Sequence, residues 1–559
     1  MPQTTPKTAR KTLPRALWWA LGWLCVQICT VALVYYWRVF YYFDRMPAGR
    51  LTLLACGVTT LLTLLCFVGV RLVHGDSARA ALCIFVCGAL FCFANPPFQA
   101  PDENLHYLRS YSVSQGHLNF DYARTYPDDV ARLVQAFPGA WVSAHTSQGM
   151  GHDQNGQPAA YSTQGFALKQ RGQDAPAEGV ADSFAAYFEA QAQNAPAPAV
   201  HEPIVVMVLP FLPQALGMAL ARLFGLDALG CLYAGRLANL AVYTLLCWLA
   251  LKNCRRYKPV FLAIMLLPLS LFMAASVSYD AMLLGFYYLV ASFYCKDQIT
   301  DRDVGWFLFA FVMMNSAKPY LNLLWLALPL ILPQKAWKTR WKKWQVALAG
   351  LGLALAMTFF VSWYGGAFRV NYPAAAFDRM LGEGVVDQLG QLRFVLSNPL
   401  RYLAVMAGTL YENQLFLGQL GLFGWLDLPI PLLNVLSPAV LVFAAALSVH
   451  EKSSLRPLPA LGLGGLSLVY IAGAMTAMYI TYTPVGMVRI IGLQARYFLP
   501  VFLMLLVLLA ALLSHVLEPR LGDGQKALNV GLGTCGVFAV LGAVLLAQHY
   551  LVGPVFLIR

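Results

Sequence analysis

The chain has 559 residues, of which 59% are hydrophobic and only 12% are Asp, Glu, Lys or Arg. Soluble proteins typically use about 25% of their residues for charge, so this composition excludes an ordinary water-soluble protein and indicates a chain that lies in a bilayer. The net charge of +13 comes from Lys and Arg at the ends of apolar runs. Because these residues form no basic stripe with interleaved aromatics, nucleic acid is not expected as a partner. The 12 cysteines show no CxxC pair and no zinc-ligand spacing.

A basic tail at residues 1–16 precedes the apolar runs of residues 17–96. Each run approaches the length of about 20 residues that crosses a bilayer. The first, Leu17 to Tyr36, is too long for a signal peptide and has no small-residue cleavage site, so we expect a retained span. Short loops rich in Lys and Arg stay in the cytoplasm, and three crossings from a cytoplasmic tail place residue 97 on the opposite side.

Residues 97–202 form the one long polar segment of the chain. We expect them to be an extracytoplasmic loop that carries catalytic residues and short interfacial helices. The stretch from Gly149 to Ala199 is rich in Gly, Ala, Gln and Pro. It is predicted to be helical only from Ala181 to Gln193 and irregular elsewhere.

Transmembrane helices are expected again in residues 203–364. Pro203 to Gly225 and Leu232 to Leu251 look like two crossings, although the charges before and after them require an odd number. Pro210 and Pro213 interrupt the first segment. We therefore expect a re-entrant or interfacial helix there.

The loops from Lys252 to Lys258, from Lys335 to Lys343 and from Lys452 to Arg456 are basic and are predicted to be cytoplasmic. Residues 365–430 are expected to form a second extracytoplasmic loop with interfacial helices, and residues 431–559 the C-terminal transmembrane helices. The predicted fold class is an all-α polytopic membrane protein of about 12–14 transmembrane helices.

Asp102 and Glu103 follow Pro101 directly after the third run, and His106 follows at helical spacing. Pro101 suits the first turn of a new helix. Acidic residues in a first turn often act only on the helix dipole. At the head of an outward cavity, a carboxylate could instead act as general base on a hydroxyl or help to hold a divalent cation.

Three further sites carry charge on the same side of the membrane. His201 and Glu202 lie where the long loop re-enters, and ordinary headgroup-level polarity is the alternative interpretation there. Asp280 lies between two apolar runs, and ionisable residues at membrane depth usually face a cavity or a partner. Lys318 invites an anion such as phosphate, unless it merely reaches for the interface.

A last polar cluster heads a span near the C-terminus. Arg489 and Arg496 offer forked donors to a phosphate or pyrophosphate. Either arginine could instead pair with Asp280 or Glu412. Tyr497 is either an interfacial aromatic or a sugar contact.

Nine motifs occur in the order found in a bacterial membrane family called domain of unknown function 2142, which the chain resembles from about residue 90 to 510. They are Pro96-Pro97, Asp102-Glu103, His106, Gln115 to Leu118, Gly235 to Asn239, Ser278 to Asp280, Lys318 to Tyr320, Gly421 to Asp427 with Pro429, and Gly492 to Pro500. That family looks related to the GT-C glycosyltransferases, which take a sugar from a polyprenyl-phosphate carrier with inversion at the anomeric carbon. The chain departs from the family at Ala495, where Gly is usual, and its loop from Phe120 to Val200 has no counterpart.

The resemblance implies a GT-C-like bundle with Asp102 or Glu103 as the catalytic base. It implies Asp280 as the second acidic position and carrier-phosphate contacts from Lys318, Arg489 and Arg496. Other substrate-binding residues predicted for the same site are His106, His201, Glu202, Gln494 and Tyr497. The cofactor stays open: a divalent cation (Mg or Mn) could take part, although the mechanism does not require one.

The expected function is an inverting glycosyltransferase that moves a sugar from a polyprenyl-phosphate donor to a glycan, glycolipid or protein acceptor. The expected location is the bacterial inner membrane, among membrane lipids, with the active site on the periplasmic side. A transporter or flippase of lipid-linked saccharides would also line a cavity with charge, but the two halves of the chain show no repeat. A scaffold subunit of an envelope-polysaccharide assembly would leave Asp102 and Glu103 without a role.

Overall fold

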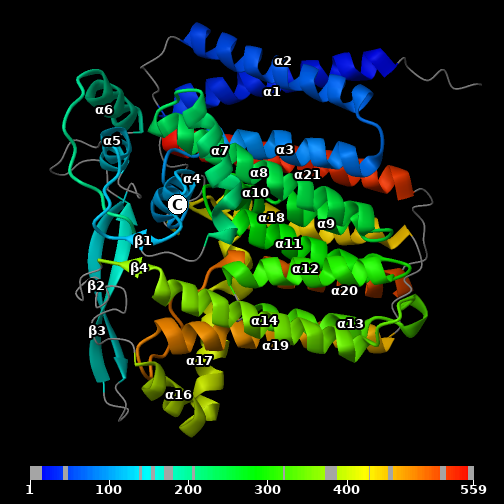
Figure 1. Ribbon diagram of the computed structural model, residues 1–559. Helices are drawn as coiled ribbons and strands as arrows, with labels where there is room; N and C mark the ends of the chain where they lie inside the picture. Colours follow the sequence, from blue (N-terminus) through cyan, green and yellow to red (C-terminus); the bar gives the residue numbers. More distant parts are fainter. Residues whose placement is uncertain are drawn as a thin grey trace, which may run out of the picture.

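The structure is a computed structural model, in which the long helices run side by side as one bundle (Figure 1). It describes residues 15–41, 48–137, 142–152, 158–168, 180–203, 208–318, 321–371, 387–426, 428–450, 457–516 and 524–551.

Six helices of the described part are long and apolar enough to cross a membrane. They are α3 (Asp76–Ala94), α8 (Ala228–Asn253), α14 (Lys343–Ala367), α19 (Pro457–Tyr482), α20 (Leu499–Val516) and α21 (Gly524–Leu551). Shorter apolar segments occur in α1 (Arg15–Tyr41), in α11 (Asp280–Ser292) and in α18 (Pro431–Leu447). The predicted all-α polytopic membrane fold is confirmed, whereas the total of about 12–14 spans stays a prediction.

The basic loops from Lys252 to Lys258 and from Lys335 to Lys343 lie at one end of the bundle, which we call the basic end, whereas the loop from Lys452 to Arg456 lies outside the described residues. Ile299 and Trp337 form a β-bridge, and the Arg340 guanidinium lies 3.6 Å from the Asp301 carboxylate. These contacts join the loop before α12 (Asp301–Ala317) to the loop before α14. The positive-inside rule predicts that the basic end faces the cytoplasm. The short elements between α3 and α8 lie at the opposite end, which we call the loop end (Figure 1).

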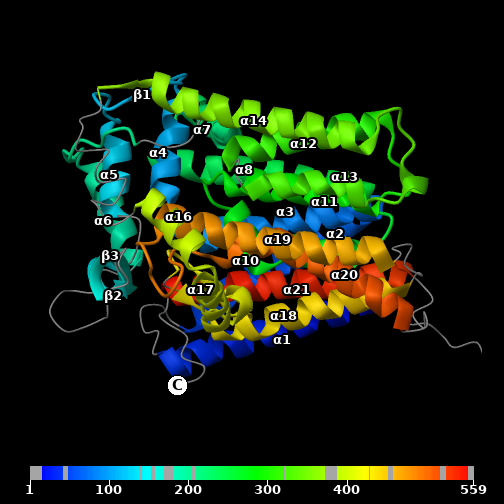
Figure 2. The same ribbon diagram turned by 90° about the horizontal axis from the view of Figure 1, so that it is seen from below.

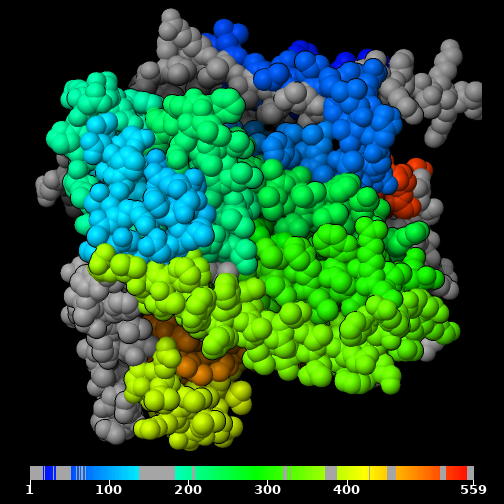
Figure 3. Space-filling view, in the orientation of Figure 1, coloured from blue at the N-terminus to red at the C-terminus, as the bar shows by residue number. Residues whose placement is uncertain are grey.

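The loop end contains most of the helices and strands that are not long spans. Figure 3 shows the residues that follow α3, in cyan, packed directly against the green helices α7 and α8. The short elements of this region are α4 (Glu103–Ser114), β1 (Phe120–Asp121), α5 (Asp128–Ala136), β2 (Val142–His152), β3 (Pro158–Leu168), α6 (Val180–Ala192), β4 (Arg369–Val370), α16 (Gln388–Ser397), α17 (Pro399–Glu412), β5 (Leu422–Phe423) and β6 (Leu428–Pro429). The helix predicted at Ala181–Gln193 is confirmed by α6.

The irregular structure predicted for the rest of Gly149–Ala199 is wrong where β2 and β3 pair in antiparallel register. The two strands run from Val142 to His152 and from Pro158 to Leu168. The sequence between them contains Asn155-Gly156, a pair that hairpin turns favour. The Gly- and Ala-rich composition concealed this local signal.

A short helical hairpin follows the long loop. After a 3₁₀ turn at Leu209–Phe211, α7 (Leu212–Leu223) has 12 residues and a length of about 18 Å, against about 30 Å of hydrocarbon. A Cβ added at Gly217 would lie 2.5 Å from the Ala234 carbonyl, so α7 packs closely on the first half of α8. Asp227, which lies between α7 and α8, accepts a hydrogen bond from Tyr187 of α6. Thus α7 returns to the loop end, and only α8 runs on to the basic end.

The core of the bundle is a broken helix. Residues 259–265 of α9 (Lys258–Met265) and all of α10 (Pro268–Ala274) are buried. Pro268 begins the second piece because it fits a first helical turn. The α10 helix packs against α3, α11 and α21, and its place inside the bundle can be followed in the view from below (Figure 2). The remaining elements are the long helix α2 (Ala48–Leu72), the short helix α13 (Leu328–Ile331) and the 3₁₀ helices Phe293–Cys295, Leu321–Ala327, Gln334–Ala336, Gln414–Gln419, Ser448–His450 and Ala495–Phe498.

Candidate functional site

The two carboxylates predicted at the head of α4 have different surroundings. Glu103 is completely buried and accepts two hydrogen bonds from Arg236 of α8, at 2.8 Å from Nε and 2.6 Å from Nη2. It accepts a third from the backbone N–H of Val277, at 2.8 Å. The same guanidinium donates to three carbonyls at the end of α3. Glu103 therefore ties α3, α4, α8 and the loop after α10 together.

Asn239 lies one helical turn beyond Arg236, on the same face of α8. Its amide donates to the carbonyls of Ser276 and Ser278, at 2.8 and 2.6 Å. The loop between α10 and α11 is thus held from two sides, by Glu103 and by Asn239. This loop leads directly to Asp280, which opens α11, where the helix dipole favours a negative charge.

Asp102 precedes Glu103 but has no such partner. Its backbone is left-handed, with φ 59° and ψ 12°, a region that Asp tolerates better than most residues. The side chain is partly exposed, and it makes no hydrogen bond or ion pair within the described residues. A small cavity beside Pro101 is also lined by Gln494 and Arg496. Asp102 is therefore an available carboxylate next to the late polar cluster.

His106 lies one turn after Asp102 and is buried. Its ring packs against Tyr279, with centroids 4.9 Å apart. Burial lowers the pKa of His106 to about 4, against the opposing effect of the charges on Asp102 and Asp280. The imidazole is accordingly neutral near pH 7, and its Nδ1 has no hydrogen-bond partner in the described part of the chain.

The cations of the site come from two other elements. Arg496 donates from Nη1 to Asp280 Oδ2 at 2.9 Å, and both side chains are more than nine-tenths buried. The Lys318 ammonium, at the end of α12, lies 4.1 Å from the centre of the Tyr497 ring and 5.5 Å from that of Tyr279. Asp280, Lys318, Arg496 and Tyr497 therefore meet, as the sequence predicted for a single site.

Two buried polar atoms in this cluster have no hydrogen-bond partner among the described residues: Nε of Arg496 and Oε1 of Gln494. Buried polar groups are normally paired, with protein or with water. Together with Nδ1 of His106, they give the cluster a capacity for polar contacts that the described protein atoms do not use.

Arg489 lies outside this cluster. Both its Nε and its Nη2 donate to the Glu412 carboxylate, at a site where the two side chains are 40% and 49% exposed. The two pairings that the sequence left open are both present, Arg489 with Glu412 and Arg496 with Asp280.

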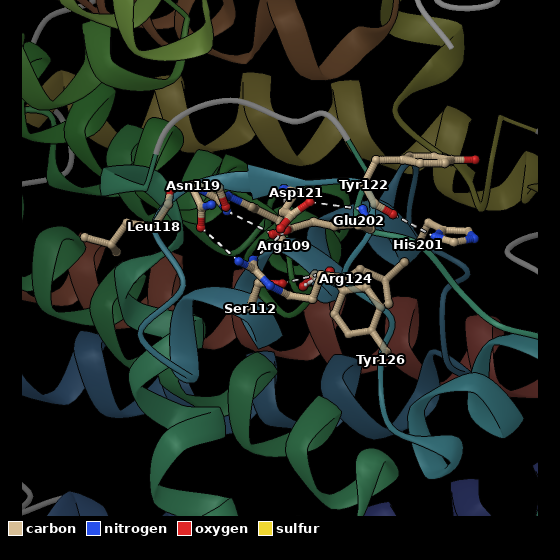
Figure 4. Close-up of polar contacts among 12 residues, drawn as sticks. Arg109, Ser112, Leu118, Asn119, Asp121, Tyr122, Arg124, Tyr126, His201 and Glu202 are labelled. Carbon is tan, nitrogen blue, oxygen red and sulfur yellow. Dashed lines mark hydrogen bonds and ion pairs between the residues drawn. The ribbon is translucent and has the colours of Figure 1, made fainter. Parts of the chain in front are cut away.

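Glu202 also belongs to a separate group of contacts, shown in Figure 4. It is buried and accepts from Arg109 of α4 at 3.1 Å and from Arg124 at 2.7 Å. The Asp121 backbone N–H donates to it at 3.1 Å. His201, its neighbour, is exposed and stacks on Tyr122 at 4.5 Å. These contacts fasten the long loop to α4, two helical turns along from Asp102.

The chain matches a known protein family. A family model described as a predicted membrane protein, DUF2142, matches residues 85–506. The chain belongs to this family. No curated protein and no solved structure matches it. The DUF2142 match contains every residue of the polar cluster, whereas α1, α2 and α21 lie outside it.

Within the part of this DUF2142 protein that the structure describes, no three His, Cys, Asp or Glu side chains come together as a metal site. Sequence reasoning gave no role to Arg236 or Asn239, although both were part of a family motif. An arginine in the middle of an apolar helix was the signal, because such a residue needs a partner.

Proposed function

We propose that this protein is an integral-membrane inverting glycosyltransferase. It transfers a sugar from a polyprenyl-phosphate donor to an extracytoplasmic glycan, glycolipid or protein of the cell envelope. The observation that carries the proposal is the position of Asp102, an available carboxylate beside a buried cluster with two cations, Lys318 and Arg496.

Asp102 is the better candidate for the base. Glu103 is committed to Arg236 and to the Val277 N–H, so its carboxylate oxygens already have donors and do not face an acceptor hydroxyl. The Asp102 carboxylate is partly exposed and can approach an acceptor hydroxyl. A general base must lie within about 3 Å of the proton that it removes. Its left-handed backbone costs of order 1 kcal/mol, which a positioning role would explain.

The cations suit the leaving group. When the anomeric C–O bond to the carrier breaks, the electron pair stays on the phosphate oxygen and negative charge grows there. Lys318 and Arg496 stabilise that charge, and the buried surroundings strengthen the effect. Asp280 holds Arg496 in place through its 2.9 Å ion pair. The neutral His106 offers a hydrogen bond without adding charge.

The lipid-linked donor reaches such a site laterally from the membrane. The cluster lies at the loop end, opposite the basic loops, which supports an active site on the periplasmic side of a bacterial inner membrane. No step needs a divalent cation, because Lys318 and Arg496 supply the positive charge that the leaving phosphate requires.

The direct test uses purified protein in lipid nanodiscs with a polyprenyl-phosphate sugar and candidate acceptors, and measures transferred sugar. The proposal expects transfer by the wild-type chain. Movement of the lipid-linked saccharide between leaflets of a liposome, with no transfer to any acceptor, would support a transporter or flippase and contradict the proposal.

A further inference from the structure

A second polar cavity lies at the basic end of the bundle, far from the candidate active site. Its volume is about 430 Å³, and it opens between the last turn of α8, the end of α11 and the start of α12. Its lining includes three basic side chains, Lys252, Lys296 and Arg302, and one acidic side chain, Asp303. The cavity therefore has an excess of positive charge.

The acidic side chain is already committed. Asp303 accepts from Lys296 at 2.5 Å and from the backbone N–H and the hydroxyl of Thr300, each at 2.9 Å. Lys296 is thus largely neutralised. Neither Lys252 nor Arg302 makes a hydrogen bond or an ion pair with any described residue. Lys252 lies over the Trp248 ring, 4.4 Å from its centre.

Part of the cavity wall is apolar. Leu249, Leu289 and Trp306 line it, and the Trp306 side chain is 45% exposed. Indole rings are enriched at the headgroup level of membranes. The cavity thus combines two available cations with an apolar wall that includes an exposed tryptophan.

We propose that this cavity binds an anionic phospholipid of the cytoplasmic leaflet. The phosphodiester lies between Lys252 and Arg302, and the acyl chains follow Leu249 and Leu289. Basic pockets between helices at the cytoplasmic side are suited to acidic headgroups. Because an exposed tryptophan and leucines line the cavity together with the cations, a lipid fits it better than a free phosphate ion.

The test is native mass spectrometry of the full chain in detergent, titrated with phosphatidylglycerol or with phosphatidylcholine of the same acyl chains. The wild type should retain phosphatidylglycerol at concentrations where phosphatidylcholine is lost. The double variant Lys252→Gln/Arg302→Gln should bind it roughly tenfold more weakly, since each basic residue near an anionic lipid contributes substantially to binding. A matched control is Lys335→Gln/Lys338→Gln, which removes the same charge from exposed positions at the same end.

Equal retention of both lipids by the wild type would overturn the proposal, as would equal weakening by the two double variants. Competition by inorganic phosphate at concentrations equal to the lipid would show a phosphate site and contradict the lipid assignment. The measurement does not depend on sugar transfer, so its result is separate from that of the proposed enzymatic function.

Discussion

Glu103 and Arg236 form a completely buried ion pair with two hydrogen bonds of 2.8 and 2.6 Å, across 133 positions of sequence. Replacing one member of such a pair leaves an uncompensated buried charge, which costs about 3–5 kcal/mol. We therefore expect Glu103→Gln to lower thermal stability in detergent strongly. Glu412→Gln breaks the exposed pair with Arg489 and should change stability little. Similar melting temperatures for the two variants would contradict the structural role of Glu103.

The sequence predicted the fold class because each long apolar run has only the bilayer as its solvent. It also predicted a cluster of Asp280, Lys318, Arg496 and Tyr497, since charges at membrane depth must meet a partner. It could not distinguish the roles of Asp102 and Glu103, which are adjacent and alike. Their difference depends on Arg236, whose contact with Glu103 is set by the packing of α8 and not by local sequence.

The separation of His201, Glu202 and Arg489 from the cluster was also outside the reach of sequence reasoning. Membrane sidedness places these residues at one end of the bundle but says nothing about their lateral positions. Glu202 finds two arginines, Arg109 and Arg124, that α4 and the following loop carry to it. Only the tertiary arrangement decides such pairings.

Arg496 should matter for the donor phosphate more than for folding. We expect Arg496→Lys to keep a positive charge near Asp280 but to lose the forked geometry and the unpartnered Nε. The KM for the polyprenyl-phosphate sugar should rise by about tenfold or more, with a smaller change in acceptor KM. Steady-state transfer assays with each substrate varied would measure both. An unchanged donor KM would contradict a phosphate contact.

The pH dependence of stability should report on His106. Its pKa falls from 6.5 to about 4 on folding, so the unfolded chain binds more protons between these values. Stability should therefore decrease as the pH falls through this window, by at most about 1.4 kcal/mol per pH unit. His106→Gln should remove this part of the dependence, measured as melting temperature at pH 7 and pH 5. The exposed His74→Gln is the control, and identical profiles for wild type and His106→Gln would contradict the prediction.

The Glu202 contacts should govern how firmly the long loop is held. Glu202→Gln weakens the bonds to Arg109 and Arg124 and leaves two cations without their shared carboxylate. We expect limited proteolysis to cut residues 97–202 faster in this variant than in wild type. Asp128→Asn, at an exposed position of the same loop, should leave the cleavage rate unchanged. A wild-type rate for Glu202→Gln would show that other contacts hold the loop.

The most direct measurement is sugar transfer by Asp102→Asn, with protein stability and donor binding measured on the same preparation. The side chain makes no hydrogen bond or ion pair with a described residue that the substitution would break, so the variant should fold and bind donor like wild type. Loss of the general base should lower kcat by about 10²–10⁴-fold. Wild-type kcat in folded Asp102→Asn would contradict the assignment of Asp102 as the catalytic base.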